Sequence, residues 1–257
     1  MRPLHDCGPS LTLPGSRRGG PVEPREPGSR SGSVTPWAWR SSFSGEDSSI
    51  LPPEFFLRET ATVARELLGC RLRTAVGGQV SEGVIVETEG YVGPHDPASH
   101  AAARIGMTRR NSAMFGSPGQ AYVYRSYGIH WCLNVVTEEV GFPAAVLLRA
   151  LDPLSGVEVM ERRRGGRMPL CSGPGRLGQA MGIQGDLNGH RFTDEPMTIS
   201  AGWRVPETEV GVSGRIGIRH AAEWPLRFFV RRHPEVSGSG ARSLEEPPMA
   251  GPAPKAL

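Results

Sequence analysis

The sequence contains almost no lysine. Of its 257 residues only Lys255 is a lysine, and the other cationic side chains, apart from histidine, are all arginines. Schiff-base chemistry needs a lysine amine, so an internal lysine nucleophile is excluded from the rest of the chain. Arginine instead suits bidentate contacts with phosphate and carboxylate groups. The formal net charge of +3 is small, so total charge indicates neither a strongly basic nor an acidic protein.

Cysteines and long apolar runs are also scarce. The four cysteines, Cys7, Cys70, Cys132 and Cys171, lie far apart and form no C-x-x-C pair. This spacing supports neither a zinc site, an iron–sulfur site nor a disulfide scaffold, and we expect no metal and no cofactor. No apolar run could span a bilayer, and the first residues lack the apolar segment of a secretory signal. We therefore expect a cytoplasmic protein without membrane contact.

Composition divides the chain into three parts. Residues 1–48 are rich in Pro, Gly, Ser and Arg without hydrophobic periodicity, which predicts a disordered leader, and residues 237–257 predict a flexible tail. Between them, helical spacing runs from Phe55 to Leu68, with Gly69 placed as a cap, and further helices are expected over 98–103 and 156–164. Strands are predicted over 71–74, 80–89, 121–124, 129–136, 144–151, 198–200, 215–218 and 226–230. The sequence thus predicts a single α+β domain over residues 49–236.

The most informative stretch carries acids into an apolar strand. Residues 83–91 begin as a buried, β-branched strand, yet they include two glutamates. Side chains alternate along a strand, so Glu87, Glu89 and Tyr91 share one face. A buried carboxylate must be paired, hydrogen-bonded or used in chemistry. One interpretation is structural, with both acids paired to arginines, and the other is that Glu89 is a catalytic acid or base. Arg149, within another apolar strand, is a candidate partner for Glu89.

Two further segments are candidates for contact with a ligand. The strands at 121–124 and 129–136 predict a hairpin whose tip carries Tyr127, and a ring at an exposed tip is a contact candidate unless it folds back over its own hairpin. Residues 173–178 match G-x-G-x-x-G, but no buried strand precedes them, so a dinucleotide site is not indicated. We expect instead a loop that binds a backbone phosphate through its amides and Arg176.

Several motifs occur in the order found in one enzyme family. They are VETEGYVGP (86–94), YVY (122–124), YG (127–128), CLN (132–134), LLRAL (147–151), LCSGP (170–174) and PLRFFV (225–230). Through them the sequence resembles the alkyladenine (3-methyladenine) DNA glycosylase family over nearly all of residues 50–234. The resemblance implies a curved, largely antiparallel sheet flanked by helices, with a protruding hairpin that inserts into DNA.

The resemblance also implies roles for individual residues. Glu89 is the expected general base that activates water, with Arg149 and the Ile216 carbonyl holding that water. Tyr91, His100 and Tyr124 are the expected walls of the base pocket, and Asn134 is expected to reject purines with a 2-amino group. Tyr127 is expected to intercalate, and Thr108, Arg110 and Met114 to contact DNA. The partner implied is double-stranded DNA with modified purines, bound by a monomer that associates with the nucleoid.

General chemistry agrees with this reading. An enzyme that acts on a base within a duplex must extrude it and fill the gap, and a hairpin ring suits that purpose. An alkylated purine is already cationic, so one general base and water suffice for its removal, and without lysine the abasic site should stay uncleaved. Two other functions remain open: a non-catalytic module that binds damaged or single-stranded nucleic acid, and a carbohydrate hydrolase that uses Glu87 and Glu89.

Overall fold

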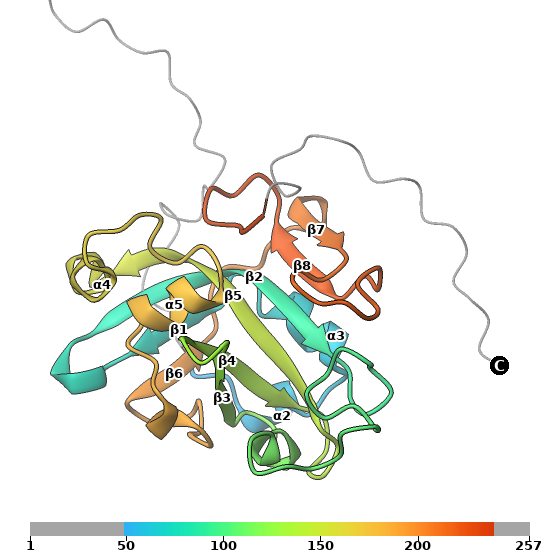
Figure 1. The fold of residues 1–257 in the computed structure, drawn as a ribbon. Helices are drawn as coiled ribbons and strands as arrows, with labels where there is room; N and C mark the ends of the chain where they lie inside the picture. Colours follow the sequence, from blue (N-terminus) through green and yellow to red (C-terminus); the bar gives the residue numbers. More distant parts are fainter. Residues whose placement is uncertain (1–48, 239–257) are drawn as a thin grey trace, which may run out of the picture. The chain divides into compact units, whose positions relative to one another are not determined.

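The centre of the structure is a long strand, β2 (Ser81–Tyr91), within an eight-stranded antiparallel sheet (Figure 1). The computed structural model describes residues 49–238. The predicted leader 1–48 and nearly all of the predicted tail 237–257 lie outside the described residues, so both remain predictions.

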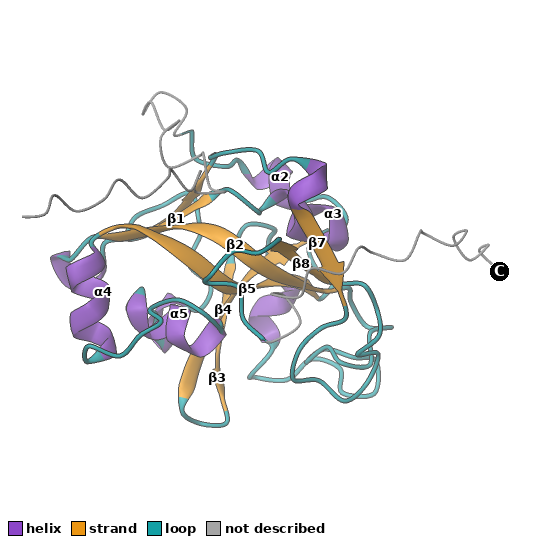
Figure 2. Ribbon diagram, turned by 90° about the horizontal axis from the view of Figure 1, so that it is seen from above, coloured by secondary structure: helices purple, strands orange, loops and turns teal. Residues whose placement is uncertain are grey.

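The sheet is strongly curved and all its printed strand pairs are antiparallel (Figures 1 and 2). Its order is β3 (Ala121–Ser126), β4 (His130–Thr137), β5 (Ala144–Ser155), β2, β1 (Arg71–Thr74) and β6 (Met197–Ser200), while β7 (Val210–Ser213) pairs with β8 (Arg227–Val230), which pairs with β2. The predicted α+β class with a curved antiparallel sheet is confirmed.

Helices cover β2 from both sides, as Figure 2 shows. The short helices α2 (Pro53–Phe56) and α3 (Thr60–Glu66) lie on one side, and α4 (Val157–Arg164) and α5 (Pro174–Ala180) lie on the other. Every residue of β2 from 83 to 90 is therefore buried, which explains the apolar run over residues 83–86. Single 3₁₀ turns complete the fold at Val76–Gly78, Ser112–Phe115, Gly185–Leu187 and Glu207–Glu209.

Two hydrophobic clusters lie against the sheet. The larger one joins the helices to the strands through side chains such as Phe56, Leu67, Ile85, Leu148 and Leu177. The smaller one contains Ala101, Met114, Tyr122, Val136 and Ala145. Tyr122 and Met114 also line the cavity described in the next section, so the smaller cluster forms the base of that cavity.

Three predicted elements differ from the structure. The helix expected over 55–68 is divided into α2 and α3, because Thr60 begins a new helix and its amide donates to the Glu138 carboxylate at 3.2 Å. The helix expected over 98–103 consists of turns. The strand expected over 215–218 is a loop, and the edge strand lies earlier, at β7. Two buried contacts made by Arg215 and Ile216, described below, explain that loop.

Within residues 49–238, no helix combines the length and hydropathy that crossing a bilayer requires.

Candidate active site

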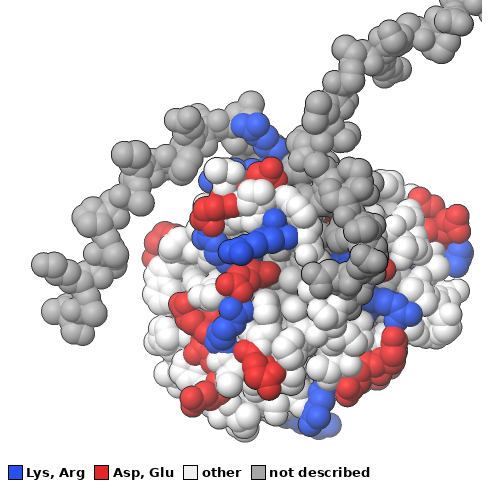
Figure 3. Space-filling model, turned by 180° about the vertical axis from the view of Figure 1, so that it is seen from behind, with Lys and Arg blue, Asp and Glu red and all other residues white. Residues whose placement is uncertain are grey.

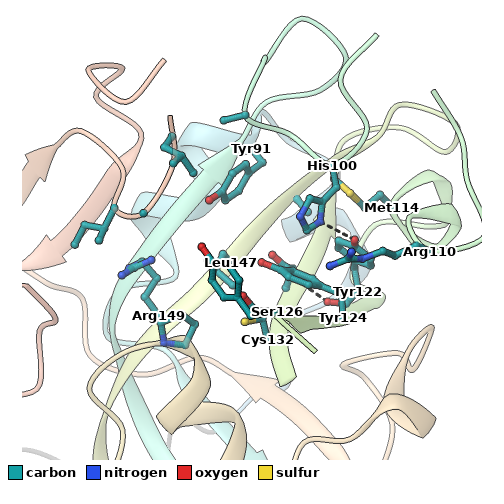
Figure 4. Close-up of a pocket in the computed structure, with 18 residues that line it drawn as sticks. Tyr91, His100, Arg110, Met114, Tyr122, Tyr124, Ser126, Cys132, Leu147 and Arg149 are labelled. Atoms are coloured by element: carbon teal, nitrogen blue, oxygen red, sulfur yellow. Dashed lines mark hydrogen bonds between the residues drawn. The ribbon is translucent and has the colours of Figure 1, made fainter. Parts of the chain in front are cut away.

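A cavity of about 600 Å³ opens beside the C-terminal end of β2. Its volume falls within the range of small-molecule sites. Figure 4 shows aromatic side chains, His100 and Arg149 surrounding this space. Most of the site residues predicted from the sequence line it, namely Tyr91, His100, Arg110, Met114, Tyr124, Tyr127, Asn134, Arg149 and Ile216. Residues from strands β2, β3, β4 and β5 and from the loops around His100, Arg110 and Ile216 thus converge on one cavity.

Glu89 lies directly behind the wall of the cavity. Its side chain is fully buried and touches three lining residues. Oε1 lies 3.2 Å from Nη1 of Arg149 and accepts the Ile216 amide at 2.7 Å, and Oε2 accepts the Tyr91 hydroxyl at 3.1 Å. The contact of Ile216 with Glu89 is made by its amide nitrogen, and the water-holding role of its carbonyl, which the family resemblance implies, remains a prediction. The carboxylate oxygens are fixed in orientation by these three donors.

Burial raises the pKa of Glu89 above its ordinary value of 4.5. Arg149, the Ile216 amide and the Tyr91 hydroxyl each act in the opposite direction, because they stabilise the ionised form, but burial has the larger effect. A carboxylate with a raised pKa is a stronger base than an ordinary glutamate. Position and basicity together make Glu89 the candidate general base.

Glu87 has a different environment from Glu89. Its Oε1 accepts Nε of Arg149 at 3.0 Å and Nε of Arg227 at 2.7 Å, and Ser237 completes the group. With two arginines bound to it and no exposed surface, Glu87 is part of a buried ion cluster. Glu87 thus matches the structural interpretation made from the sequence, whereas Glu89 has one arginine partner, Arg149, and lies against the cavity wall.

The aromatic wall of the cavity is built on β3. His100 packs edge-to-face on Tyr124, with ring centroids 4.5 Å apart, and its Nδ1 lies 2.9 Å from the Tyr122 hydroxyl. Tyr122 and Tyr124 stack at 5.3 Å. Sequence reasoning missed Tyr122 as a pocket residue, although alternation along the strand places it on the same face as Tyr124. Burial, together with the nearby Arg110, lowers the pKa of His100, so its ring is neutral near pH 7.

Asn134 and Cys132 form the adjoining part of the wall on β4. Asn134 is opposite Tyr122 in the strand register, and its Nδ2 donates to the Tyr122 carbonyl at 2.8 Å. Cys132 is opposite Tyr124, and burial raises the pKa of its thiol. Asn134 is only 3% exposed, so its amide is held in one orientation at the side of the cavity.

A buried ion pair that the sequence did not suggest lies behind Tyr91, on another side of the cavity. Asp96 and Arg215 are both fully buried, and Nη2 of Arg215 donates to Oδ1 of Asp96 at 2.9 Å. The Arg215 guanidinium also lies 4.8 Å from the centre of the Tyr91 ring. Since Arg215 immediately precedes Ile216, the pair fixes the loop whose amide contacts Glu89. This explains why residues 215–218 leave the sheet.

The β3–β4 hairpin protrudes from the sheet, as Figure 2 shows. Its tip holds Tyr127, with φ of 50°, and Gly128, with φ of 70°, the two positive angles of a tight hairpin turn. Tyr127 is 91% exposed and Ile129 67% exposed. A tyrosine folded back over its own hairpin would be covered, so that alternative is wrong. A left-handed backbone conformation costs a non-glycine residue about 1 kcal/mol. The turn imposes this conformation on Tyr127, whose aromatic side chain lies at the tip.

The remaining predicted contact residues lie in different surroundings. Thr108 is exposed outside the cavity, and its backbone amide donates to Oδ1 of Asn111 at 2.6 Å. Arg110 lines the cavity and lies over the Tyr124 ring. Met114 is 2% exposed and belongs to the floor of the cavity, not to the outer surface. Arg176 is exposed on α5, so the phosphate-binding loop expected there is a helix.

Among the described residues, no three His, Cys, Asp or Glu side chains gather in an arrangement that could hold a metal ion.

Comparison with known proteins gives this geometry a context. A family model described as Methylpurine-DNA glycosylase (MPG) matches residues 54–234. The chain belongs to this family. The family match covers the whole sheet, all helices except the first residue of α2, and every cavity residue described above, whereas Ser237 lies beyond it. It supports the resemblance found in the sequence motifs.

Relatives within the family match most of this chain and most of their own length. A protein of Carboxydothermus hydrogenoformans is 43% identical over 191 residues, which cover 73% of this chain and 98% of the relative. One of Methanoculleus marisnigri is 46% identical over 194 residues, with the same coverage of both chains. One of Rhodopseudomonas palustris (strain HaA2) is 49% identical over 179 residues, covering 69% of this chain and 85% of the relative. Each bears the name "Putative 3-methyladenine DNA glycosylase".

Proposed function

We propose that this member of the methylpurine-DNA glycosylase family removes alkylated or deaminated purines from duplex DNA by hydrolysing the N-glycosidic bond. The observation that carries the proposal is the position of Glu89, a buried carboxylate of raised pKa directly behind an aromatic cavity. A flipped base occupies the cavity, and Glu89 activates the water that attacks its sugar.

The cavity suits a flat, positively charged base. Tyr91, Tyr124 and His100 provide ring faces and edges at its border, and electron-rich rings attract a cation more strongly than a neutral base. The neutral state of His100 at pH 7 avoids adding a further positive charge beside such a base. Asn134 is the residue that we propose rejects a purine with a 2-amino substituent, and its hydrogen bond to the Tyr122 carbonyl supports this by fixing its amide.

The reaction requires one proton acceptor. The oxygen of water forms a bond to C1′ as the N-glycosidic bond breaks, and the electron pair of that bond passes to the purine, which becomes neutral if it was alkylated. The water proton passes to Glu89. A cationic purine leaves as a neutral base, so it needs no acid, whereas a deaminated purine is neutral and takes up a proton from solvent water as it leaves. Glu87 is already engaged by two arginines. This engagement argues against a hydrolase that uses both carboxylates.

Base extrusion requires something to occupy the vacated position in the stack. Tyr127 is the exposed aromatic residue at the hairpin tip, and it also lines the mouth of the cavity. Insertion of its ring between base pairs would hold the flipped base in place.

Local arginines supply the contacts to DNA phosphates. Basic and acidic side chains are interspersed on the face shown in Figure 3, and exposed ion pairs such as Arg58–Glu66, at 2.8 Å, match that pattern. Arg110 and Arg125 lie together beside the hairpin, since Arg110 donates to the Arg125 carbonyl at 3.0 Å, and exposed Arg176 begins α5 next to the cavity residue Pro174.

The product should be an intact abasic site. Strand cleavage by β-elimination proceeds through a Schiff base on an amine, and residues 49–238 include no lysine. The test is incubation with methylated duplex and, separately, with inosine-containing duplex. We expect release of free modified purine and a DNA strand that breaks only after alkaline treatment. Binding of the damaged duplex without any base release would support the non-catalytic binding module instead.

A further inference from the structure

The buried ion cluster around Glu87 includes the hydroxyl of Ser237, whose role the proposed reaction does not explain. Ser237 lies beyond the last strand, and its oxygen contacts both Glu87 and Arg149. The Ser237 backbone amide also donates to Oε2 of Glu87 at 2.7 Å, and its carbonyl accepts Nη2 of Arg227 at 2.7 Å. Ser237, near the end of the described residues, thus makes four hydrogen bonds to buried side chains of the sheet.

Arg149 is bound through all three nitrogens of its guanidinium group. Nε donates to Oε1 of Glu87 at 3.0 Å, Nη2 donates to Oγ of Ser237 at 3.0 Å, and Nη1 lies 3.2 Å from Oε1 of Glu89. A planar fork with one partner at each nitrogen has a single orientation. None of these three partners lines the cavity, and Glu89 also bonds to two residues that do, Tyr91 and Ile216.

The hydroxyl of Ser237 has a defined direction. An arginine can only donate, so Oγ accepts from Arg149, and the hydroxyl proton is then directed to Oε1 of Glu87 at 2.9 Å. Glu87 accepts from Arg149, Arg227 and both donors of Ser237. Its negative charge is therefore shared between two arginines, so only part of the charge of Arg149 is free to interact with Glu89.

We infer that Glu87 and Ser237 are positioning residues for the reaction, which aim Nη1 of Arg149 at Glu89 and limit how strongly that arginine stabilises the Glu89 carboxylate. The inference rests on the proposed function, because it concerns the base that activates water. The repulsion from Glu87, which acts to raise the pKa of Glu89, is consistent with it. The other groups that face Glu89 are Tyr91 on β2, Arg149 on β5 and the Ile216 amide in the loop beside Arg215.

Ser237→Ala separates positioning from folding. Ser237 is only half-buried, so the variant should fold, and it removes the hydroxyl between Arg149 and Glu87. We expect its single-turnover excision rate to fall about tenfold, while the affinity for abasic-site duplex stays within about twofold. Ser237→Thr retains the hydroxyl and should restore most of the rate. Ser213→Ala is the matched control, because Ser213 contacts Arg227 at 3.0 Å and does not contact Arg149.

Glu87→Gln tests the claim that Glu87 limits how strongly Arg149 stabilises the Glu89 carboxylate. Without the Glu87 charge, the repulsion that acts to raise the pKa of Glu89 is lost, so the acid limb of the excision rate should move to lower pH. An unchanged acid limb would overturn the electrostatic claim, and should this buried variant fail to fold, the two Ser237 variants decide.

Wild-type rates in Ser237→Ala, or equal losses in Ser237→Ala, Ser237→Thr and Ser213→Ala, would overturn the inference alone. Absence of base release by the wild-type chain would overturn the proposed function, and the inference with it.

Discussion

Asp96→Asn is the substitution that best tests whether the buried ion pair behind Tyr91 supports the site. The change removes one charge while keeping an oxygen that can accept the Ala98 amide, which Oδ1 of Asp96 accepts at 2.9 Å. Arg215, whose side chain is fully buried, would then lack its counter-charge. The loop that holds the Ile216 amide on Glu89 begins at this arginine.

The expected magnitude follows from the burial of both partners. Breaking a buried pair by removing one member costs about 3–5 kcal/mol of unfolding free energy. For a domain of this size each kcal/mol lowers the melting temperature by about 2–4 °C, so a decrease of about 6–20 °C is expected. Excision should fall as well, because the Ile216 amide loses its fixed position.

Urea unfolding and thermal melting measure the effect directly. The double variant Asp96→Asn with Arg215→Met provides the control, since removing both charges avoids an uncompensated ion and should recover part of the lost stability. A change of less than about 1 kcal/mol in Asp96→Asn, or a double variant that is less stable than the single one, would refute this reasoning.

Three further outcomes are expected. Tyr127→Ala should reduce excision from duplex DNA more than from single strands, because the wedge is needed only where a stack must be refilled; equal losses on both substrates would contradict a wedge. The excision rate should decrease as pH falls through the raised pKa of Glu89, since the protonated carboxyl cannot accept a proton, and an acid limb at or below pH 4.5 would oppose the assigned environment. Duplex affinity should weaken with salt, with a log–log slope of roughly −3 if Arg110, Arg125 and Arg176 each contact one phosphate. Titration at several salt concentrations measures this slope, and a salt-independent affinity would contradict the phosphate contacts.

The sequence predicted those features that depend on local pattern. Alternation along a strand placed Glu87, Glu89 and Tyr91 on one face, and the structure joins the first two to the same arginine. The same rule applied to β3 would have found Tyr122 beside Tyr124. The hairpin was predictable because two β-rich segments flank a short turn with a glycine.

The features that the sequence did not predict depend on contacts between distant residues. Asp96 and Arg215 are separated by 119 positions, and no local pattern marks either as buried. The β-rich composition of 215–218 suggested a strand, but the contacts of Arg215 and Ile216 hold that segment as a loop. Ser237 was assigned to the tail on composition alone, although its four polar contacts join it to the sheet.

The most direct test of the account is the release of 3-methyladenine from methylated duplex by the Glu89→Gln variant. The amide keeps the size of the side chain but cannot accept the proton of water, so we expect release to fall by about 100-fold or more relative to the wild-type chain. Binding to abasic-site duplex should persist, which would show that the variant is folded. Unimpaired release of 3-methyladenine by Glu89→Gln would contradict the assignment of Glu89 as the general base.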